Sequence, residues 1–164
     1  MNESILLYDT TLRDGTQGEN INFSADEKVK IAERLDDIGV QYIEGGWPGS
    51  NPKDIQFFDL VRRIKFKQTK ITSFGATRRP GIAPEDDPNL EALLDSHTSV
   101  VTIFGKSWDL HVERIMSNTL EENIEMIRDS VEFLKDHKRE VIYDAEHFFD
   151  GYKNNKEYAC RTLV

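Results

Sequence analysis

Short apolar runs and longer amphipathic segments alternate along the chain. Residues 5–7 are a short apolar run of the kind typical of a strand buried on both faces, and residues 100–104 are the clearest strand of the set. Further strands are expected at residues 40–44, 70–75 and 140–145. Between these runs, apolar residues recur every three or four positions, which is the pattern of a helix with one buried face. The pattern therefore predicts a strand followed by a helix, five times over.

Residues that cap helices stand at the expected helix starts. Ser24 precedes Glu27, and Thr119 precedes Glu122, each at the spacing of a capping box. The other starts are marked by asparagine or aspartate, two of them directly before a proline that suits the first helical position: Asn51, Asp87 and Asn155. We therefore expect helices to begin after each of these caps.

Alternation of strand and helix implies parallel strands joined by right-handed crossovers. An open doubly wound sheet and an eightfold barrel both fit this pattern. No Gly-x-Gly-x-x-Gly turn follows the first apolar run, which weakens a dehydrogenase or nucleotide-binding interpretation. Polar or charged residues follow every strand, at the edge where barrel enzymes carry their active sites: Asp14, Glu44, Thr77, Lys106 and Glu146. This favours an α/β fold formed by five βα units of a TIM (β/α)8 barrel.

A complete barrel of this kind takes about 250 residues and eight repeats. The chain has 164 residues and supplies five repeats. We therefore expect residues 1–164 to be the N-terminal part of a truncated catalytic barrel, with the remaining barrel strands absent.

Composition points to a globular protein of the cytoplasm. Hydrophobic residues make up 38% and charged residues 31%, and no apolar run approaches the roughly 20 residues of a membrane span. The start of the chain has neither a basic leader nor an apolar signal core. Cys160 is the only cysteine, which fits a reducing compartment.

The formal net charge of −9 argues against nucleic acid as the main partner. An anionic ligand would therefore need a metal ion or local positive charge. Arg78, Arg79 and Lys106 are candidates for that charge, although we expect them chiefly as solvated loop charges.

The most informative stretch is the polar turn 8–17 that follows the first strand. It places Arg13 beside Asp14, and two charges at the end of a buried strand need partners. Asp14 suits a hard divalent cation, and Arg13 suits a carboxylate or ketone oxygen of a ligand. The alternative is that both pair with other side chains while Gly15 makes the turn.

This turn closely resembles the opening motif of the metal-dependent Claisen-condensing synthases and related lyases with an Asp-Arg-Glu triad. That family includes isopropylmalate, homocitrate and citramalate synthases and hydroxymethylglutaryl-CoA lyase. Three further segments are similar to its citramalate synthase branch: residues 42–54, 100–110 and 141–152. The resemblance thus covers essentially the whole chain.

The resemblance implies a role for each matching residue. Asp14 would bind a divalent metal (Mg, Mn or Zn), and Arg13 would polarise the keto group of the substrate. Glu44 would hold Arg13 or act in catalysis, and Glu146 would lie near the 2-oxo acid and the acetyl group. The expected catalytic residues are Arg13, Glu44 and Glu146, and the expected substrate-binding residues are Arg13, Gln17, Glu44, Thr77 and Glu146. Turn hydrogen bonding for Gln17 and a structural ion pair for Glu44 remain the alternatives.

The implied reaction is a condensation of acetyl-CoA with a 2-oxo acid, with pyruvate giving citramalate for isoleucine biosynthesis. The implied full-length enzyme is a homodimer with a C-terminal regulatory domain. A 2-isopropylmalate or homocitrate synthase is an alternative, and so is an inactive barrel fragment that needs its missing half. The family's late His-x-His metal ligands have no counterpart, because no two of the four histidines have that spacing: His97, His111, His137 and His147.

Overall fold

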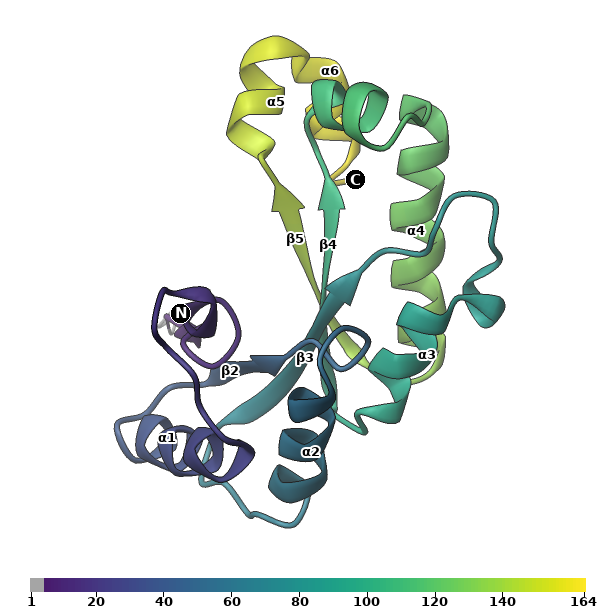
Figure 1. Cartoon of the computed structure of the whole chain (residues 1–164). Helices are drawn as coiled ribbons and strands as arrows, with labels where there is room; N and C mark the ends of the chain where they lie inside the picture. The colour runs from purple at the N-terminus through teal and green to yellow at the C-terminus, as the bar shows by residue number, and fades with distance from the viewer. Residues whose placement is uncertain (1–4) are drawn as a thin grey trace. The chain divides into compact units, whose positions relative to one another are not determined.

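The computed structural model describes residues 5–164, in which strands and helices alternate (Figure 1). The strands are β1 (Tyr8–Asp9), β2 (Tyr42–Gly46), β3 (Lys70–Ala76), β4 (Val100–Lys106) and β5 (Glu140–Glu146). The helices are α1 (Ala25–Asp37), α2 (Pro52–Val61), α3 (Pro88–Asp95), α4 (Leu120–Asp136), α5 (Phe148–Asn154) and α6 (Lys156–Arg161). Shorter turns are η1 (Gly15–Gln17), η2 (Pro84–Asp86) and the π-helical η3 (His111–Ile115).

The five strands are parallel and follow one another in chain order, β1-β2-β3-β4-β5. Tyr8 pairs with Tyr42, and Ile43 pairs with Ile71. Residue contacts divide the chain into two compact units. Unit 1 comprises the chain through Phe74 together with Ala92–Val101, and unit 2 comprises Gly75–Glu91 together with Thr102–Val164. No helix within residues 5–164 is long and apolar enough to cross a membrane.

The core of unit 1 lies between its strands and the helices α1 and α2, which contact each other below β2 in Figure 1. Ile43 of β2 and Phe57 of α2 are fully buried there. Ser24 caps α1 with a complete capping box: its hydroxyl accepts from Glu27 N, and the Glu27 carboxylate accepts from Ser24 N. This helix start is therefore as predicted.

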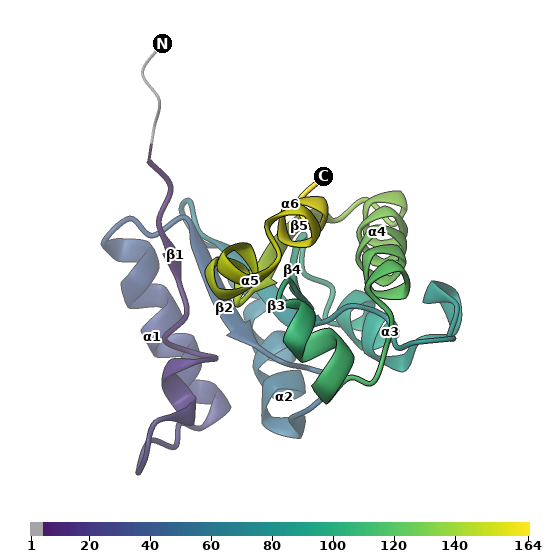
Figure 2. The same ribbon diagram turned by 90° about the horizontal axis from the view of Figure 1, so that it is seen from above.

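Unit 2 is built around α4, whose side chains Met126 and Leu134 are almost completely buried. The helix contacts β5, and the short helices α5 and α6 lie side by side (Figure 2). Asn155 caps α6 by accepting from Tyr158 N at 3.1 Å, as the sequence predicts. The helix α5 was not expected, because its Phe148-Phe149 pair and Gly151 do not give a helical apolar pattern.

The prediction of a buried first strand at residues 5–7 is wrong. Ile5, Leu6 and Leu7 are 87%, 57% and 54% exposed, and the strand is the two-residue β1 that follows them. The strand β1 stands at the end of the sheet order and pairs with β2 alone. An edge strand has one uncovered side, so an apolar run beside it is not enclosed.

The second predicted capping box is only half formed. Thr119 Oγ1 accepts from Glu122 N at 3.1 Å, but Thr119 N donates to Asn118 Oδ1 at 2.8 Å. The Glu122 carboxylate instead accepts from Arg78 Nη1 at 3.0 Å. A cation from a distant part of the sequence therefore takes the place of the return bond of the box.

Candidate active site

The turn that follows β1 holds the backbone of Arg13 in place. The carbonyl of Thr10 accepts from the N–H groups of Arg13 and Gly15, both at 3.1 Å. Thr16 Oγ1 donates to the Arg13 carbonyl at 2.7 Å. The polar residues that follow the strand thus satisfy one another's backbone hydrogen-bonding groups. These hydrogen bonds fix the turn from which the Arg13 side chain projects.

The guanidinium of Arg13 has three neighbours of different kinds. Its Nε donates to Glu44 Oε1, and its Nη1 donates to Asp14 Oδ1 at 3.1 Å. Its Cζ lies 3.8 Å from the ring centroid of Phe74. The side chain is 17% exposed. The charge is therefore compensated and oriented, but it still reaches solvent.

Glu44 is 2% exposed and uses both carboxylate oxygens. Arg13 Nε donates to Oε1, and the Tyr8 hydroxyl donates to Oε2 at 2.5 Å. A buried carboxylate is stable only when it is paired and hydrogen-bonded in this way. The geometry suits an anchor for Arg13 better than a free acid or base.

A buried ion pair supports the loop that follows Glu44. Lys28 of α1 donates to Asp54 Oδ1 at 2.5 Å, and Asp54 Oδ2 accepts from Trp47 N at 2.8 Å. The indole of Trp47 packs edge-on against Phe74 with a centroid distance of 5.8 Å. At Gly46, φ is +152°, and an added Cβ would lie 2.3–2.7 Å from the Asp54 carboxylate. The Phe74 ring therefore contacts Trp47 as well as the Arg13 guanidinium.

Asp14 is the exposed member of this group, with 61% of its side chain accessible. A carboxylate beside a single arginine is chemically suited to be one ligand of a divalent cation. Within residues 5–164, no three His, Cys, Asp or Glu side chains are grouped so that they could hold a metal ion. Gln17 lies in η1 with an exposed side chain, and its N donates to Asp14 O at 2.9 Å.

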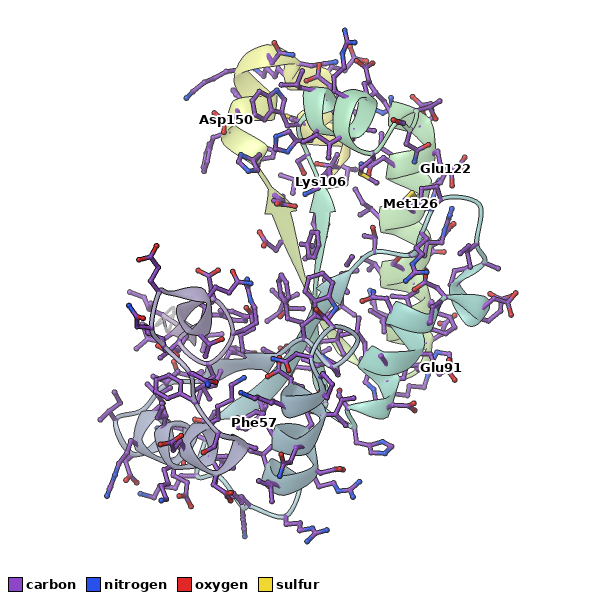
Figure 3. The ribbon with its side chains drawn as sticks, in the orientation of Figure 1. Phe57, Glu91, Lys106, Glu122, Met126 and Asp150 are labelled. Atoms are coloured by element: carbon purple, nitrogen blue, oxygen red, sulfur yellow. The ribbon has the colours of Figure 1, made fainter. Side chains whose placement is uncertain are left out.

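The remaining predicted site residues belong to unit 2. Thr77 follows β3, is buried, and donates its N to Phe104 O at 3.1 Å. Lys106 at the end of β4 forms an ion pair with Glu146 at the end of β5, with Nζ 2.5 Å from Oε2. Figure 3 labels Lys106 at the tip of its strand. The structure thus groups Arg13, Asp14 and Glu44 in one unit and Lys106 with Glu146 in the other.

The expectation that the basic loop residues are chiefly solvated is wrong for Arg78. Arg78 is only 7% exposed, and its guanidinium contacts Asp129 at 2.7 Å and Glu122 at 3.0 Å. Burial opposes the charge, yet these two carboxylates raise the pKa of Arg78 above its usual value. Lys106 is likewise paired rather than solvated, whereas Arg79 is exposed. Both acidic partners of Arg78 lie more than forty positions away in the sequence, so no local pattern could reveal them.

The sequence itself indicates no role for His111. It lies in η3, where its ring packs against His147 with a centroid distance of 4.5 Å. The only signal in the sequence is its distance of five residues from the strand end at Lys106, which is compatible with the same edge of the sheet.

Comparison with known proteins places this geometry in a family. The HMGL-like family model matches residues 4–161. The chain is 56% identical over 163 residues to the (R)-citramalate synthase of Aquifex aeolicus, an alignment covering 99% of this chain and 31% of that enzyme. It is 34% identical over 162 residues to homocitrate synthase AksA of Methanopyrus kandleri, covering 98% of this chain and 37% of the relative. The chain thus spans about a third of the length of these relatives.

A solved structure shows the same fold. Hydroxymethylglutaryl-CoA lyase from Pseudomonas aeruginosa superposes with a TM-score of 0.65 at 19% sequence identity, covering 85% of this chain and 45% of the lyase. The prediction of five βα units of the TIM-barrel type is confirmed. The family model and the sequence relatives agree over nearly the whole chain, and the chain therefore belongs to the HMGL-like family.

Proposed function

We propose that this chain supplies the arginine-bearing part of an active site that condenses acetyl-CoA with pyruvate to give citramalate. The observation that carries the proposal is the Arg13 guanidinium, held by Glu44 and Phe74 beside the exposed carboxylate of Asp14. The 56% identity to a citramalate synthase, against 34% to a homocitrate synthase, supports pyruvate over the larger 2-oxo acids.

Arg13 has the chemistry that such a condensation requires. When the new carbon–carbon bond forms, negative charge develops on the ketone oxygen of the 2-oxo acid. A preorganised donor directed at that oxygen lowers the barrier, and one such donor is typically worth about 10²–10³-fold in rate. Nη2 of Arg13 donates neither to Glu44 nor to Asp14, and it is therefore the group that we assign to the substrate oxygen.

Asp14 would hold a divalent metal ion (Mg, Mn or Zn) as one of several ligands. Such an ion, when bound, polarises a carbonyl oxygen as a Lewis acid. One carboxylate does not hold a metal ion tightly, so further ligands are needed beyond the described residues of this chain. In a chimera that carries this chain within a complete citramalate synthase, removal of divalent metal with EDTA is therefore expected to abolish turnover. Added Mg²⁺ or Mn²⁺ is expected to restore it.

We assign Glu44 to the positioning of Arg13, because both of its oxygens are already engaged. Glu146 forms an ion pair with Lys106 and would face the 2-oxo acid and the acetyl group. Gln17 and Thr77 remain proposed substrate contacts. We further propose that residues 1–164 form the N-terminal part of a catalytic barrel in a cytoplasmic, homodimeric enzyme, and that the chain alone does not turn over.

The test replaces the matching segment of the Aquifex aeolicus citramalate synthase with this chain. Thiol release from acetyl-CoA is then followed for the chimera and for the isolated chain, with pyruvate, 2-oxoisovalerate and 2-oxoglutarate in parallel. Turnover by the chimera with pyruvate, and none by the isolated chain, is expected. Preference for 2-oxoisovalerate or 2-oxoglutarate would make isopropylmalate or homocitrate synthesis the better assignment. Turnover by the isolated chain would contradict its proposed dependence on further ligands.

A further inference from the structure

Buried polar side chains of unit 2 hold the last residue of β4. The carbonyl of Lys106 accepts from Asn123 Nδ2 at 2.8 Å and from the Tyr158 hydroxyl at 3.3 Å. Asn123 Nδ2 also donates to the Tyr158 hydroxyl oxygen at 2.7 Å, so the three groups form a closed triangle. Asn123 and Tyr158 are both almost completely buried. The proposed function above gives neither of them a role.

The two side chains come from two different helices, each fixed near its start. Asn123 lies one turn into α4, where its N–H donates to Thr119 O at 3.1 Å. Tyr158 lies in the first turn of α6, and its N–H donates to the capping residue Asn155 at 3.1 Å. Figure 1 shows α5 and α6 beyond the arrowheads of β4 and β5. The end of β4 is therefore tied to α4 and to α6 by side chains whose own backbones are held.

The residue that follows β4 is restrained in the same manner. Ser107 is fully buried, and its N–H donates to Glu146 O at 3.1 Å. Its hydroxyl oxygen lies 2.7 Å from Thr162 Oγ1 and 3.4 Å from the Tyr143 hydroxyl oxygen. Thr162 Oγ1 donates to Ala159 O at 2.7 Å, and it therefore accepts from Ser107. The backbone beyond β4 is thus held by β5 and by the end of α6.

The orientation of the Asn123 amide shows which of its contacts dominates. Its Oδ1 is inaccessible to solvent and has no hydrogen-bond partner within residues 5–164. A buried acceptor without a partner is costly, and the amide could offer Oδ1 to the Tyr158 hydroxyl by turning over. Turning over would place Oδ1 against the Lys106 carbonyl, where two acceptors repel each other. The amide therefore leaves one acceptor unsatisfied in order to keep its bond to Lys106.

The side chain that extends from this restrained backbone carries the ion pair with Glu146. Lys106 Nζ lies 2.5 Å from Glu146 Oε2, and the two side chains are 21% and 33% exposed. An ion pair between accessible, flexible side chains ordinarily has no fixed geometry, because both side chains lose rotational freedom when it forms. A lysine whose backbone is already held loses less of that freedom. The restraint at the Lys106 carbonyl therefore favours one position of the Glu146 carboxylate.

We propose that Asn123 and Tyr158 are positioning residues. By holding the Lys106 carbonyl they aim its ammonium group at Glu146, and the ammonium group fixes the Glu146 carboxylate for the bound ligand. This inference rests on the proposed function, in which Glu146 faces the 2-oxo acid and the acetyl group. Misplacement of a group in the site by about 1 Å can lower the rate about 10²-fold. Loss of the hydrogen bonds to Lys106 is therefore expected to lower kcat although neither positioning residue touches the ligand.

The first test observes the lysine ammonium groups of the chain itself in ¹H–¹⁵N NMR spectra. An ammonium group held in an ion pair exchanges its protons slowly, so we expect signals from Lys106 and from the buried Lys28. Glu146→Gln identifies the Lys106 signal by removing it. Tyr158→Phe keeps the ring but not the hydroxyl, and it should weaken the Lys106 signal while the Lys28 signal shows that the fold is retained. A Lys106 signal absent from the unaltered chain, or as strong in Tyr158→Phe as in the control Tyr152→Phe, would overturn the inference.

The second test is a double-mutant cycle on thiol release by the chimera. Tyr158→Phe is expected to lower kcat with pyruvate by about 10–10²-fold, and so is Asn123→Asp, which puts an acceptor where the donating nitrogen stands. Lys106→Met removes the ammonium group that the two residues position. In that background neither change is expected to lower kcat further, because interacting residues are not additive. A general loosening of the fold would instead lower kcat by the same factor in both backgrounds.

The outcomes separate this inference from the proposed function. An active chimera in which Tyr158→Phe and Asn123→Asp turn over like the control Tyr152→Phe overturns the inference and leaves the proposed function standing. Equal losses in the presence and absence of the Lys106 ammonium group make Asn123 and Tyr158 residues of the fold alone, which also overturns the inference. A chimera that releases no thiol overturns the proposed function, and with it the effect of the two residues on turnover.

Discussion

Arg13 is held by a carboxylate, an aromatic face and a neighbouring aspartate. Glu44 sets the direction of its Nε, Phe74 supports its plane, and Asp14 contacts its Nη1. A guanidinium whose flat face and edge are both constrained loses little further freedom when a ligand binds. At the scale of single residues, the Arg13 guanidinium is therefore held in place before any ligand binds.

The Tyr8 hydroxyl completes this arrangement, and its removal has a measurable cost. Tyr8→Phe leaves Glu44 Oε2 without that donor in a buried setting. We expect the free energy of unfolding to fall by about 1–3 kcal/mol, as measured by urea denaturation. The control Tyr152→Phe, at a residue 39% exposed, should have a much smaller effect. Equal effects of the two changes would show that the hydrogen bond from Tyr8 to Glu44 does not stabilise the fold.

The lowered pKa of Asp36 should make the free energy of unfolding depend on pH. The residue is buried, which opposes its charge, but the backbone N–H groups of Lys67, Gln68 and Thr69 lower its pKa to about 2. Because the folded state holds this proton more weakly, the stabilisation is complete above the unfolded pKa of about 3.9 and is lost as the pH falls through about 2.

Asp36→Asn is therefore expected to lower the free energy of unfolding by about 2 kcal/mol at pH 7. The difference from the unaltered chain should shrink below pH ~4, as followed by urea denaturation across this range. Asp59→Asn, at a site 57% exposed, is the control. A difference for Asp36→Asn that stays constant down to pH ~2 would contradict the assigned cause.

At the scale of elements, the ion pair of Lys28 and Asp54 links α1 to α2. Both residues are about 95% buried, at 4% and 5% exposure. Breaking one partner of such a pair leaves an uncompensated buried charge. Lys28→Met is therefore expected to cost about 3–5 kcal/mol in urea denaturation. Lys30→Met, on the exposed face of the same helix, is the matched control. A loss no larger than that of the control would show that Asp54 is satisfied without Lys28.

Elements whose determinants are local could be predicted from the sequence. Ser24, Asn51 and Asp87 each cap the helix that follows them, since the cap and its N–H partners lie within three residues. Predictions failed where a distant residue decided the outcome. Arg78 takes the Glu122 carboxylate from the second capping box, and the edge position of β1 leaves residues 5–7 uncovered.

At the scale of the whole molecule, the order of the strands was predictable but the pairing of charges was not. Alternation of strand and helix implies parallel neighbours, and thus it implies that Lys106 and Glu146 end adjacent strands. It does not indicate that the two form an ion pair, nor that His147 turns back onto His111. The resemblance supplied Arg13, Asp14 and Glu44 as site residues, whereas their neighbours Tyr8 and Phe74 emerged only from the structure.

The proposed function requires Arg13 to act on the substrate rather than to serve only the fold. The most direct measurement is the kcat/KM for pyruvate of the chimera carrying Arg13→Lys, beside a control carrying Arg62→Lys at an exposed arginine of the α2 C-terminus. Lysine keeps the charge but not the planar fork of donors.

We predict a fall in kcat/KM of about 10²–10³-fold for Arg13→Lys, and unchanged kinetics for Arg62→Lys. Unfolding curves of the two variants should differ little, because the ammonium group introduced by Arg13→Lys would retain a cation beside Glu44. An Arg13→Lys chimera as active as the Arg62→Lys control would contradict the account, because the guanidinium would then have no part in the reaction.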